Sequence, residues 1–182
     1  MTKIIVVGTG YWGRNLVRNF HELGVLAGLC DTDSEVMSAL SKAYPVDKTW
    51  TSVDEAFAAP GLDAVAIATP AATHGALTQK ALRSGKSVFV EKPLCLDLPE
   101  AAALKKLADN SGKVLMVGHL MLYHPAFQAL QDAVNDGRIG ELRYIYSNRA
   151  SLGKIRREEN ALWSFAPHDI SMILALAKRM PE

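Results

Sequence analysis

The sequence predicts an α/β protein in which a doubly wound parallel sheet is followed by the start of a second α+β domain that is incomplete. Three observations lead to this prediction. A glycine-rich segment follows the first apolar strand, strands and helices then alternate to about residue 120, and the pattern changes beyond that point. Short, fully apolar strands that alternate with helices are typical of a parallel sheet covered on both faces. We therefore expect one domain over residues 1–120 and a truncated second one over residues 121–182.

The first strand and the glycine-rich segment carry the strongest signal. A β-branched run ends at Val7 and continues as Gly-Thr-Gly-Tyr-Trp-Gly, after which apolar residues recur at helical spacing from Leu16 to Leu23. A second apolar strand over residues 26–30 ends at Asp31. Strand, glycine turn, helix and acidic residue in this order form the fingerprint of a Rossmann dinucleotide-binding domain, whereas the bland alternative is a glycine turn with a chance carboxylate.

Each position of this fingerprint has an expected task. The first glycine permits the tight turn, the second lets the backbone approach a pyrophosphate, and the third allows close packing of helix on strand. The N–H groups of the first helical turn would face the phosphates. The candidate cofactor-binding residues of this segment are Gly8, Thr9, Gly10, Tyr11, Trp12 and Gly13.

Asp31 is placed to accept hydrogen bonds from the adenosine ribose hydroxyls. A 2′-phosphate would meet this carboxylate with Asp33 nearby and no Arg or Lys close in sequence. The sequence therefore favours NAD over NADP as the cofactor.

Composition narrows the class of protein. The 182 residues carry a formal net charge of +1, which gives no electrostatic case for nucleic acid or an anionic membrane. No apolar run approaches the roughly 20 residues that span a bilayer, and Lys3 followed by glycines argues against a signal peptide. Cys30 and Cys95 form no disulfide framework, so we expect reduced thiols in the cytoplasm. The histidines show no metal-ligand spacing, so no metal is expected.

The alternation continues along the first domain. Strands are expected over residues 65–69, 87–90 and 114–117, and helices over residues 74–84 and 99–110. Ligands of such sheets bind at the carboxyl ends of the strands. The polar motifs that fall there are Thr69-Pro70, Glu91-Lys92-Pro93 and Gly118-His119.

The pattern changes after residue 120. A helical stripe ends at Asp136-Gly137, and residues 141–148 then alternate as in a strand with one covered face, Leu142, Tyr144 and Tyr146 being on one side. A charged loop and an apolar helix over residues 165–177 follow. One strand and two helices cannot close a second domain, so we expect a chain that is truncated or that depends on a partner to cover this sheet.

Several of these motifs together resemble one enzyme family. With Ala-Ile-Ala-Thr-Pro at residues 66–70, His74, Ala81, Gly85-Lys86 and Glu-Lys-Pro-Leu at residues 91–94, the chain resembles the glucose–fructose oxidoreductase / inositol dehydrogenase / rhizopine catabolism (Gfo/Idh/MocA) family. The resemblance covers essentially the whole chain but only about the first half of a typical member. It implies a second domain that builds the substrate wall and the oligomer interface, and hydride transfer between NAD or NADP and a sugar or polyol carbon.

The resemblance implies two catalytic residues, Lys92 and His168. The family's lysine of Glu-Lys-Pro lies beside the substrate hydroxyl and the nicotinamide, and a lysine before proline favours extended backbone at a strand end. The family's histidine follows the first strand of the second domain, and a neutral imidazole can accept the hydroxyl proton. Pro167 would suit a first helical turn. The alternatives are a solvated lysine at a turn and a histidine that caps or packs its helix.

The remaining candidates are contacts to cofactor or substrate. Thr69 and Pro70 would lie against the nicotinamide end of the cofactor, and Glu91 would orient Lys92 or the nicotinamide ribose. His74 either lies near the cofactor, as the family implies, or caps or packs the following helix. The candidate substrate contacts are His119, Tyr123, Arg156, Arg157 and Ser164.

These substrate candidates leave alternatives open. The two arginines could grip a diphosphate as bidentate donors, or belong to a solvated loop, while His119 packs or contacts substrate. Ser164 stands where many members carry an aspartate, and Leu122 stands where many carry an arginine. Residues 118–125, 156–160 and 163–170 look most like members that act on nucleotide-linked sugars.

The sequence thus predicts a cytoplasmic, NAD-dependent oxidoreductase that reversibly oxidises a secondary alcohol of a sugar or nucleotide sugar. A homo-oligomer would form through the second-domain sheet if that sheet is complete, and neither nucleic acid nor membrane is an expected partner. The alternatives are a non-catalytic dinucleotide-binding sensor module or inactive fragment, and an enzyme acting on a non-sugar such as a bile pigment or imine. The departures at Ser164 and Leu122 keep the last alternative open.

Overall fold

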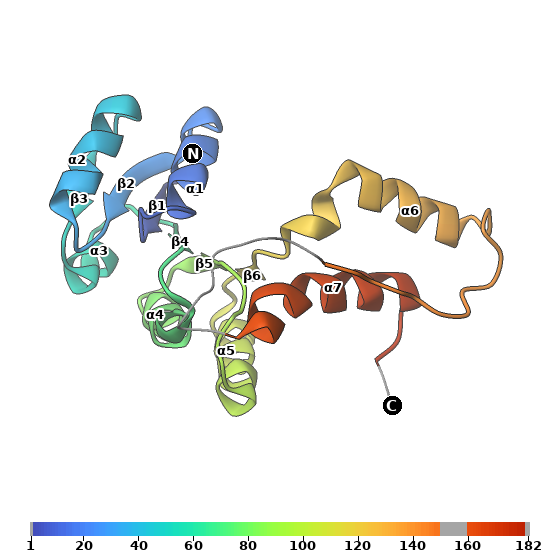
Figure 1. Ribbon diagram of the computed structural model, residues 1–182. Coiled ribbons are helices and arrows are strands. Elements are labelled where there is room, and N and C mark those ends of the chain that lie inside the picture. Colours follow the sequence, from blue (N-terminus) through green and yellow to red (C-terminus); the bar gives the residue numbers. More distant parts are fainter. Residues whose placement is uncertain (1, 150–159, 181–182) are drawn as a thin grey trace. The chain divides into compact units, whose positions relative to one another are not determined.

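The computed structural model describes residues 2–149 and 160–180 and divides into two compact units, Met1–Gly118 and His119–Glu182 (Figure 1). The first unit is a six-stranded parallel sheet with helices, so the expected α/β class is confirmed. Its strands are β1 (Ile4–Val7), β2 (Leu26–Cys30), β3 (Lys48–Trp50), β4 (Ala64–Ile67), β5 (Ser87–Val90) and β6 (Leu115–Val117). Its helices are α1 (Gly13–Glu22), α2 (Ser34–Ala43), α3 (Val53–Ala58), α4 (Ala71–Arg83) and α5 (Leu98–Ser111).

The strand order decides where a ligand can bind. The strands lie in the order β3-β2-β1-β4-β5-β6, and every neighbouring pair is parallel. The chain therefore places β2 and then β3 on one side of β1. It then crosses to the other side of β1, where β4, β5 and β6 follow in order. The crevice outside the carboxyl ends of β1 and β4 is the topological switch point, where sheets of this order bind their ligands.

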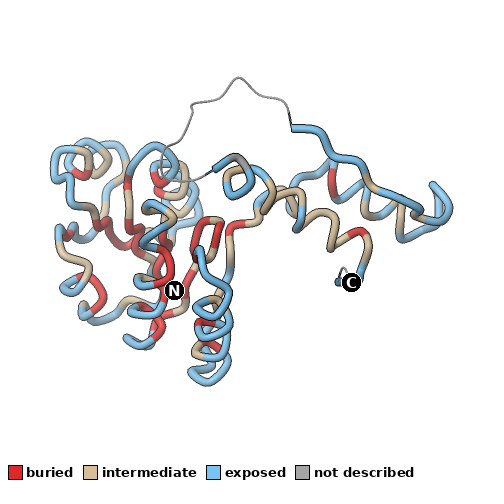
Figure 2. Tube along the Cα trace, turned by 60° about the horizontal axis from the view of Figure 1, so that its bottom comes forward, coloured by how far each residue is buried: buried red, intermediate tan, exposed pale blue. Residues whose placement is uncertain are grey.

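Apolar side chains cover both faces of the sheet. Along β1, Ile5 and Val7 belong to one buried cluster and Val6 to the other, because successive strand residues point to opposite faces. The first cluster also contains Ile67 of β4, and the second contains Val17 of α1. The central strands β1, β2 and β4 are accordingly the most buried part of this unit, and buried segments gather in its interior in Figure 2.

The helices of this unit begin in two different ways. Side chains cap α2, α3 and α5, since Asp33, Ser52 and Asp97 accept hydrogen bonds from backbone N–H groups of the first turn. Trp12 and Pro70 directly precede α1 and α4, and among the described residues neither of these helix starts has a side-chain cap. These two helices follow β1 and β4, so both uncapped ends belong to the switch point.

The second unit contains fewer elements. They are the 3₁₀ helix η1 (Leu120–Tyr123) and the helices α6 (Pro125–Asn135) and α7 (Ala161–Ala177). The strand expected over residues 141–148 is not formed, because no neighbouring strand among the described residues offers it hydrogen bonds. Tyr144 and Tyr146, which would share one side of that strand, are 84% and 80% exposed.

The position expected for Pro167 is also corrected. Helix α7 begins at Ala161, where the Asn160 side chain accepts a 3.0 Å hydrogen bond from the Trp163 N–H. Pro167 therefore lies in the interior of the helix rather than in its first turn, and it has no N–H to donate to the carbonyl four residues earlier. Among the helices that the structure describes, none has the length and apolar character needed to cross a membrane.

Candidate functional site

Two glycines of the loop after β1 are required by packing. Gly8 has φ of +84°, and a Cβ at this position would approach the Thr69 nitrogen to 2.7 Å. A Cβ on Gly13 would overlap the Gly8 carbonyl oxygen. The loop therefore passes directly over the end of β4 and folds back on itself, and larger residues at either position would displace it.

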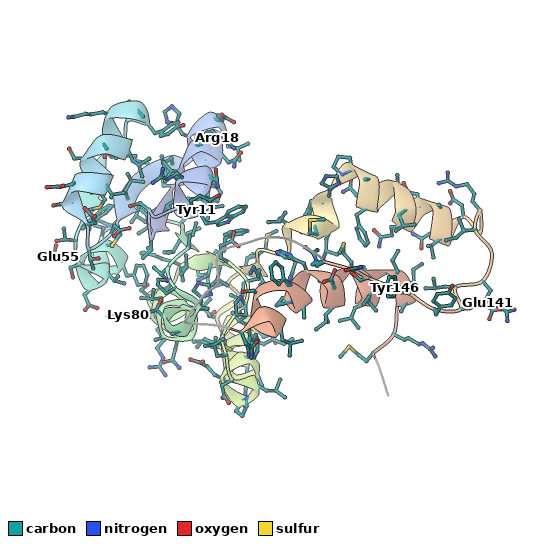
Figure 3. The ribbon with its side chains drawn as sticks, in the orientation of Figure 1. Tyr11, Arg18, Glu55, Lys80, Glu141 and Tyr146 are labelled. Carbon is teal, nitrogen blue, oxygen red and sulfur yellow. The ribbon has the colours of Figure 1, made fainter. Side chains whose placement is uncertain are left out.

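The outer side of this loop is open. A Cβ on Gly10 would meet no atom of the described residues within 4 Å, and Tyr11 is 85% exposed at the start of α1 (Figure 3). Gly10 is thus not needed for packing. The space above it suits the close approach of a ligand to the backbone, which is the task of the middle glycine in a dinucleotide-binding loop.

The starts of α1 and α4 supply positive electrostatic potential to the same place. The first N–H groups of a helix have no partner within the helix, and the helix dipole adds about half a positive charge there. In the described part of the chain neither start has a side-chain cap, and neither first turn contains an acidic residue. This arrangement suits an anionic group such as a pyrophosphate.

Asp31 follows β2 and is fixed by the glycine loop. Its Oδ2 accepts hydrogen bonds from the Thr9 backbone N–H at 2.5 Å and the Thr9 hydroxyl at 2.9 Å, and its Oδ1 accepts one from the Asp33 N–H at 3.1 Å. Burial raises the pKa of Asp31, but the hydrogen bonds from Thr9 and Asp33 outweigh it and leave the pKa lowered. The carboxylate is therefore held ionised beside the loop.

Glu91 joins the glycine loop to the end of β5. The Trp12 indole Nε1 donates a 2.7 Å hydrogen bond to its Oε1, and only 9% of the residue is exposed. Burial raises the pKa of Glu91, and the hydrogen bond from Trp12 and the nearby Lys92 and His74 oppose that rise. A Cβ on Gly118 would come within 3.1 Å of the carboxyl group, so this glycine makes room for it.

His74 joins the ends of β4 and β5 from within α4. It is 2% exposed, its Nε2 lies 2.8 Å from the Thr69 carbonyl oxygen, and its Nδ1 lies 2.6 Å from the Pro93 carbonyl oxygen. The Lys92–Pro93 peptide bond is cis, and Lys92 is half-buried at the turn that Pro93 completes. The histidine thus packs in its helix and also connects it to the turn that carries Lys92.

The candidates of the second unit lie on η1 and α7. His168 and Ser164 are half-buried on α7, Tyr123 is exposed at the end of η1, and His119 precedes η1. Arg156 and Arg157 lie outside the described residues.

Beside His168, the Asp169 carboxylate accepts hydrogen bonds from Ser147 at 2.9 Å and from Arg149 at 2.8 Å. Burial raises the pKa of Asp169, but the bonds from Arg149 and Ser147 outweigh it and lower the pKa. Asp169 therefore holds the segment that ends at Arg149 against α7.

The structure brings most cofactor candidates of the first unit together. Gly8 adjoins Thr69, Trp12 bonds Glu91, and His74 reaches both Thr69 and the Lys92-Pro93 turn. These residues fit a dinucleotide, because the open loop, the two uncapped helices and the ionised Asp31 offer donors for phosphates and an acceptor for ribose. The sequence did not reveal that Thr9 fixes Asp31 or that Gly118 makes room for Glu91, since neither role leaves a pattern in the chain.

Comparison with protein-family models gives a match over residues 2–119 to the model GFO_IDH_MocA, described as "Oxidoreductase family, NAD-binding Rossmann fold". The UDP-N-acetylglucosamine 3-dehydrogenase of Acidithiobacillus ferrooxidans is 32% identical over 177 residues, which are 97% of this chain and 54% of that protein. The inositol 2-dehydrogenase of Rhizobium meliloti is 35% identical over 120 residues, 66% of this chain and 36% of that protein. The chain thus spans about half the length, or less, of these relatives.

Solved structures of similar proteins have the same fold as this chain. A protein from Magnetospirillum magnetotacticum MS-1 has a TM-score of 0.88 and 34% identity, covering 100% of this chain and 58% of that one. An oxidoreductase from Agrobacterium radiobacter, solved in complex with NAD⁺, L-tartaric acid and magnesium, has a TM-score of 0.73 and 25% identity, covering 77% of this chain and 42% of that one.

Proposed function

We propose that this chain, which belongs to the Gfo/Idh/MocA family of NAD-binding oxidoreductases, is part of a dehydrogenase acting on a secondary alcohol of a sugar or nucleotide sugar. Residues 2–119 are the NAD-binding Rossmann domain of that family. The observation that carries the proposal is the meeting of two uncapped helix starts, the ionised Asp31 and the Lys92 turn at one edge of the sheet.

Asp31 supports NAD rather than NADP as the cofactor. A ribose hydroxyl can donate to Oδ1, or can replace the Thr9 hydroxyl on Oδ2. A 2′-phosphate at the same place would face a carboxylate whose lowered pKa keeps it charged. The repulsion between the two anions would disfavour NADP.

The proposed chemistry uses Lys92 and His168. NAD bound at this site would supply the nicotinamide ring to which a hydride passes from the alcohol carbon, or from which it returns to the carbonyl carbon. The Lys92 ammonium donates a hydrogen bond to the substrate oxygen and stabilises the negative charge that develops there. His168 accepts the hydroxyl proton during oxidation and donates it back during reduction. Glu91, fixed by Trp12, orients the Lys92 turn.

The substrate class is supported by a relative that acts on a nucleotide sugar. UDP-N-acetylglucosamine 3-dehydrogenase aligns with 97% of this chain, including the second unit. In this proposal His119, Tyr123 and Ser164 contact the sugar, and Arg156 and Arg157 bind the diphosphate as bidentate donors. The exposed Tyr144 and Tyr146 would lie in a homo-oligomer interface, and the enzyme would work in the cytoplasm.

A thermal-shift titration tests this proposal. A ligand that binds only the native state adds about 2.7 kcal/mol of stability at a hundredfold excess over Kd. We expect NADH to raise the melting temperature more than NADPH, with a further rise for one member of a panel of sugars and nucleotide sugars. A shift with NADH alone would favour a non-catalytic dinucleotide-binding module. No shift with either cofactor would refute the proposed cofactor site.

Substitution of Lys92 tests the chemistry. Lys92→Met keeps an unbranched side chain that is one atom shorter and removes its charge and its donors, so most turnover of the sugar found in that panel should be lost. The affinity for NADH, measured by the same titration, should stay nearly unchanged. Lys80→Met is the control, because Lys80 is exposed on α4, pairs with Asp54 and is not among the candidate site residues. Turnover that survives Lys92→Met would exclude Lys92 as the catalytic residue.

A further inference from the structure

We propose that His74 donates hydrogen bonds from both ring nitrogens, and so acts as a buried cationic clamp that positions the Lys92 turn against the end of β4. The hydrogen bonds themselves belong to the fold and do not depend on the proposed reaction. Only the consequence for Lys92 rests on the proposed function.

The two partners of His74 leave one choice of proton placement. Both are backbone carbonyl oxygens, of Thr69 and Pro93, and a carbonyl oxygen can only accept. A neutral imidazole has one N–H, so one of its nitrogens would direct a lone pair at an oxygen 2.6 or 2.8 Å away. Those separations are at the short end of the range for N–H···O hydrogen bonds. Two donated bonds account for both distances, and they require a proton on each nitrogen.

Because His74 is buried, the number of protons on its ring affects the stability of the fold. His74 is 2% exposed, so water has little access to either nitrogen or to the carbonyl oxygens they face. A buried polar group without its hydrogen bond destabilises the fold, and a buried charge needs a nearby opposite charge. The charged groups around His74 must therefore balance it.

Glu91 supplies the opposite charge. Its buried carboxyl group interacts electrostatically with both His74 and Lys92, and the Trp12 indole holds it in place. On the other side, α5 packs the Glu100 carboxyl against Gly75, the residue that follows His74. Glu91 is thus the acidic group that interacts directly with the histidine, and the charges of His74 and Glu91 stabilise each other.

The clamp fixes the backbone on both sides of the cofactor candidates. Thr69 lies in the short segment between β4 and α4, and Pro93 follows Lys92 directly in the chain. By donating to both carbonyls, His74 sets the separation between these two segments, and with it the place of the Lys92 backbone. His74 is therefore a positioning residue that acts through the turn and does not itself contact the reacting atoms.

Nuclear magnetic resonance of the histidine rings tests this inference without cofactor or turnover. Long-range ¹H–¹⁵N spectra of the uniformly labelled chain separate rings that carry two N–H protons from rings that carry one. The spectra would be recorded at a pH of about 8, which is well above the pKa of about 6.5 of histidine in model peptides. We expect His74 to show two protonated nitrogens, while exposed His21 on α1 shows one and serves as the internal control. One unprotonated nitrogen on His74 would overturn the proposal.

Two variants sharpen the result. His74→Gln identifies the signals by their loss, and backbone-to-ring correlations of the unchanged chain identify them if that variant does not fold. Glu91→Gln removes the opposite charge while keeping the shape of the side chain, and in this variant His74 should lose one ring proton at the same pH. If His74 keeps both protons without the Glu91 charge, the role given to Glu91 is wrong. None of these outcomes depends on whether the chain binds NADH.

Discussion

The two units of the chain differ in how they use their apolar side chains. Among the described residues, buried positions lie mostly in the first unit (Figure 2), and the second unit contributes only Phe127 and Leu176 to the buried apolar side chains. Large apolar side chains of the second unit stand exposed, for example Leu162 and Ile170 on α7. Stability from apolar burial, at roughly 25 cal/mol per Å², therefore belongs mainly to the Rossmann sheet.

This difference in packing determines which unit can hold its candidate site residues at fixed positions. In the first unit, strands with side chains packed on both faces hold the glycine loop, Asp31 and the Lys92 turn at fixed positions. The candidates of the second unit depend on one helix and on single contacts such as the bond between Arg149 and Asp169. Elements with few buried contacts open more easily than a packed core. We expect the first unit to dominate cooperative unfolding and the second to open separately.

The largest difference in stability is expected between two variants that each replace one isoleucine by alanine, one variant in each unit. Ile67 of β4 is completely buried, so Ile67→Ala should lower the free energy of unfolding by about 2–5 kcal/mol through lost burial and a cavity. Ile170 of α7 is 52% exposed, so Ile170→Ala should change it by less than about 0.5 kcal/mol. Urea unfolding of both variants measures the contrast. Losses of similar size would show that the two units share one core.

A smaller effect should separate the two kinds of glycine in the loop. Gly13→Ala forces a Cβ onto the Gly8 carbonyl and should cost about 1–3 kcal/mol of stability by overpacking. Gly10→Ala adds a Cβ in open space, so stability should stay within about 0.5 kcal/mol. The same Cβ should weaken NADH binding by about tenfold, or 1.4 kcal/mol, because it stands where the cofactor approaches. Unfolding and thermal-shift titrations with NADH test both statements, and unchanged NADH binding in Gly10→Ala would contradict the location of the phosphate site.

The elements of the fold differ in how well the sequence predicts them. The strands over residues 26–30 and 87–90 have the bounds that the sequence predicts, because an apolar run ends at an acidic residue in each case, Asp31 and Glu91. Nothing was predicted over residues 34–58, where α2, β3 and α3 lie. β3 is a three-residue edge strand with exposed Lys48 and Thr49, and so short an element leaves no periodic pattern.

The site shows a similar limit. The glycine spacing and Asp31 could be found from the sequence because each needs a particular residue type at a fixed distance. Asp33 was considered only for its charge near the cofactor, whereas the structure uses it to cap α2. The bonds of His74 could not be predicted, because both partners are backbone carbonyls, which every residue carries. The strand over residues 141–148 failed for the opposite reason, since its pattern is clear and a neighbouring strand is what the described residues lack.

The smallest effect should come from the two fixed carboxylates, one in each unit. Asp31 and Asp169 both have a lowered pKa in the folded chain, because hydrogen bonds to the charged form outweigh burial. Such a group stabilises the fold above its unfolded value of about 3.9, and this contribution is lost as the pH falls through the lower folded value. Asp31→Asn should therefore lower the stability by about 1 kcal/mol at neutral pH, given its partial exposure, and the difference from the unchanged chain should shrink in acid below about pH 4.

Asp169→Asn should behave differently if the units open separately. It removes the negative charge and one of the two oxygens that accept from Arg149 and Ser147, but the main unfolding transition, which reports the first unit, should stay within about 0.5 kcal/mol of the unchanged chain. The loss should appear instead as faster hydrogen exchange of the α7 amides, since local opening is what the Asp169 contacts oppose. Urea unfolding together with exchange rates resolved by residue distinguishes the two cases. A main transition that shifts as far for Asp169→Asn as for Asp31→Asn would mean that the two units unfold as one.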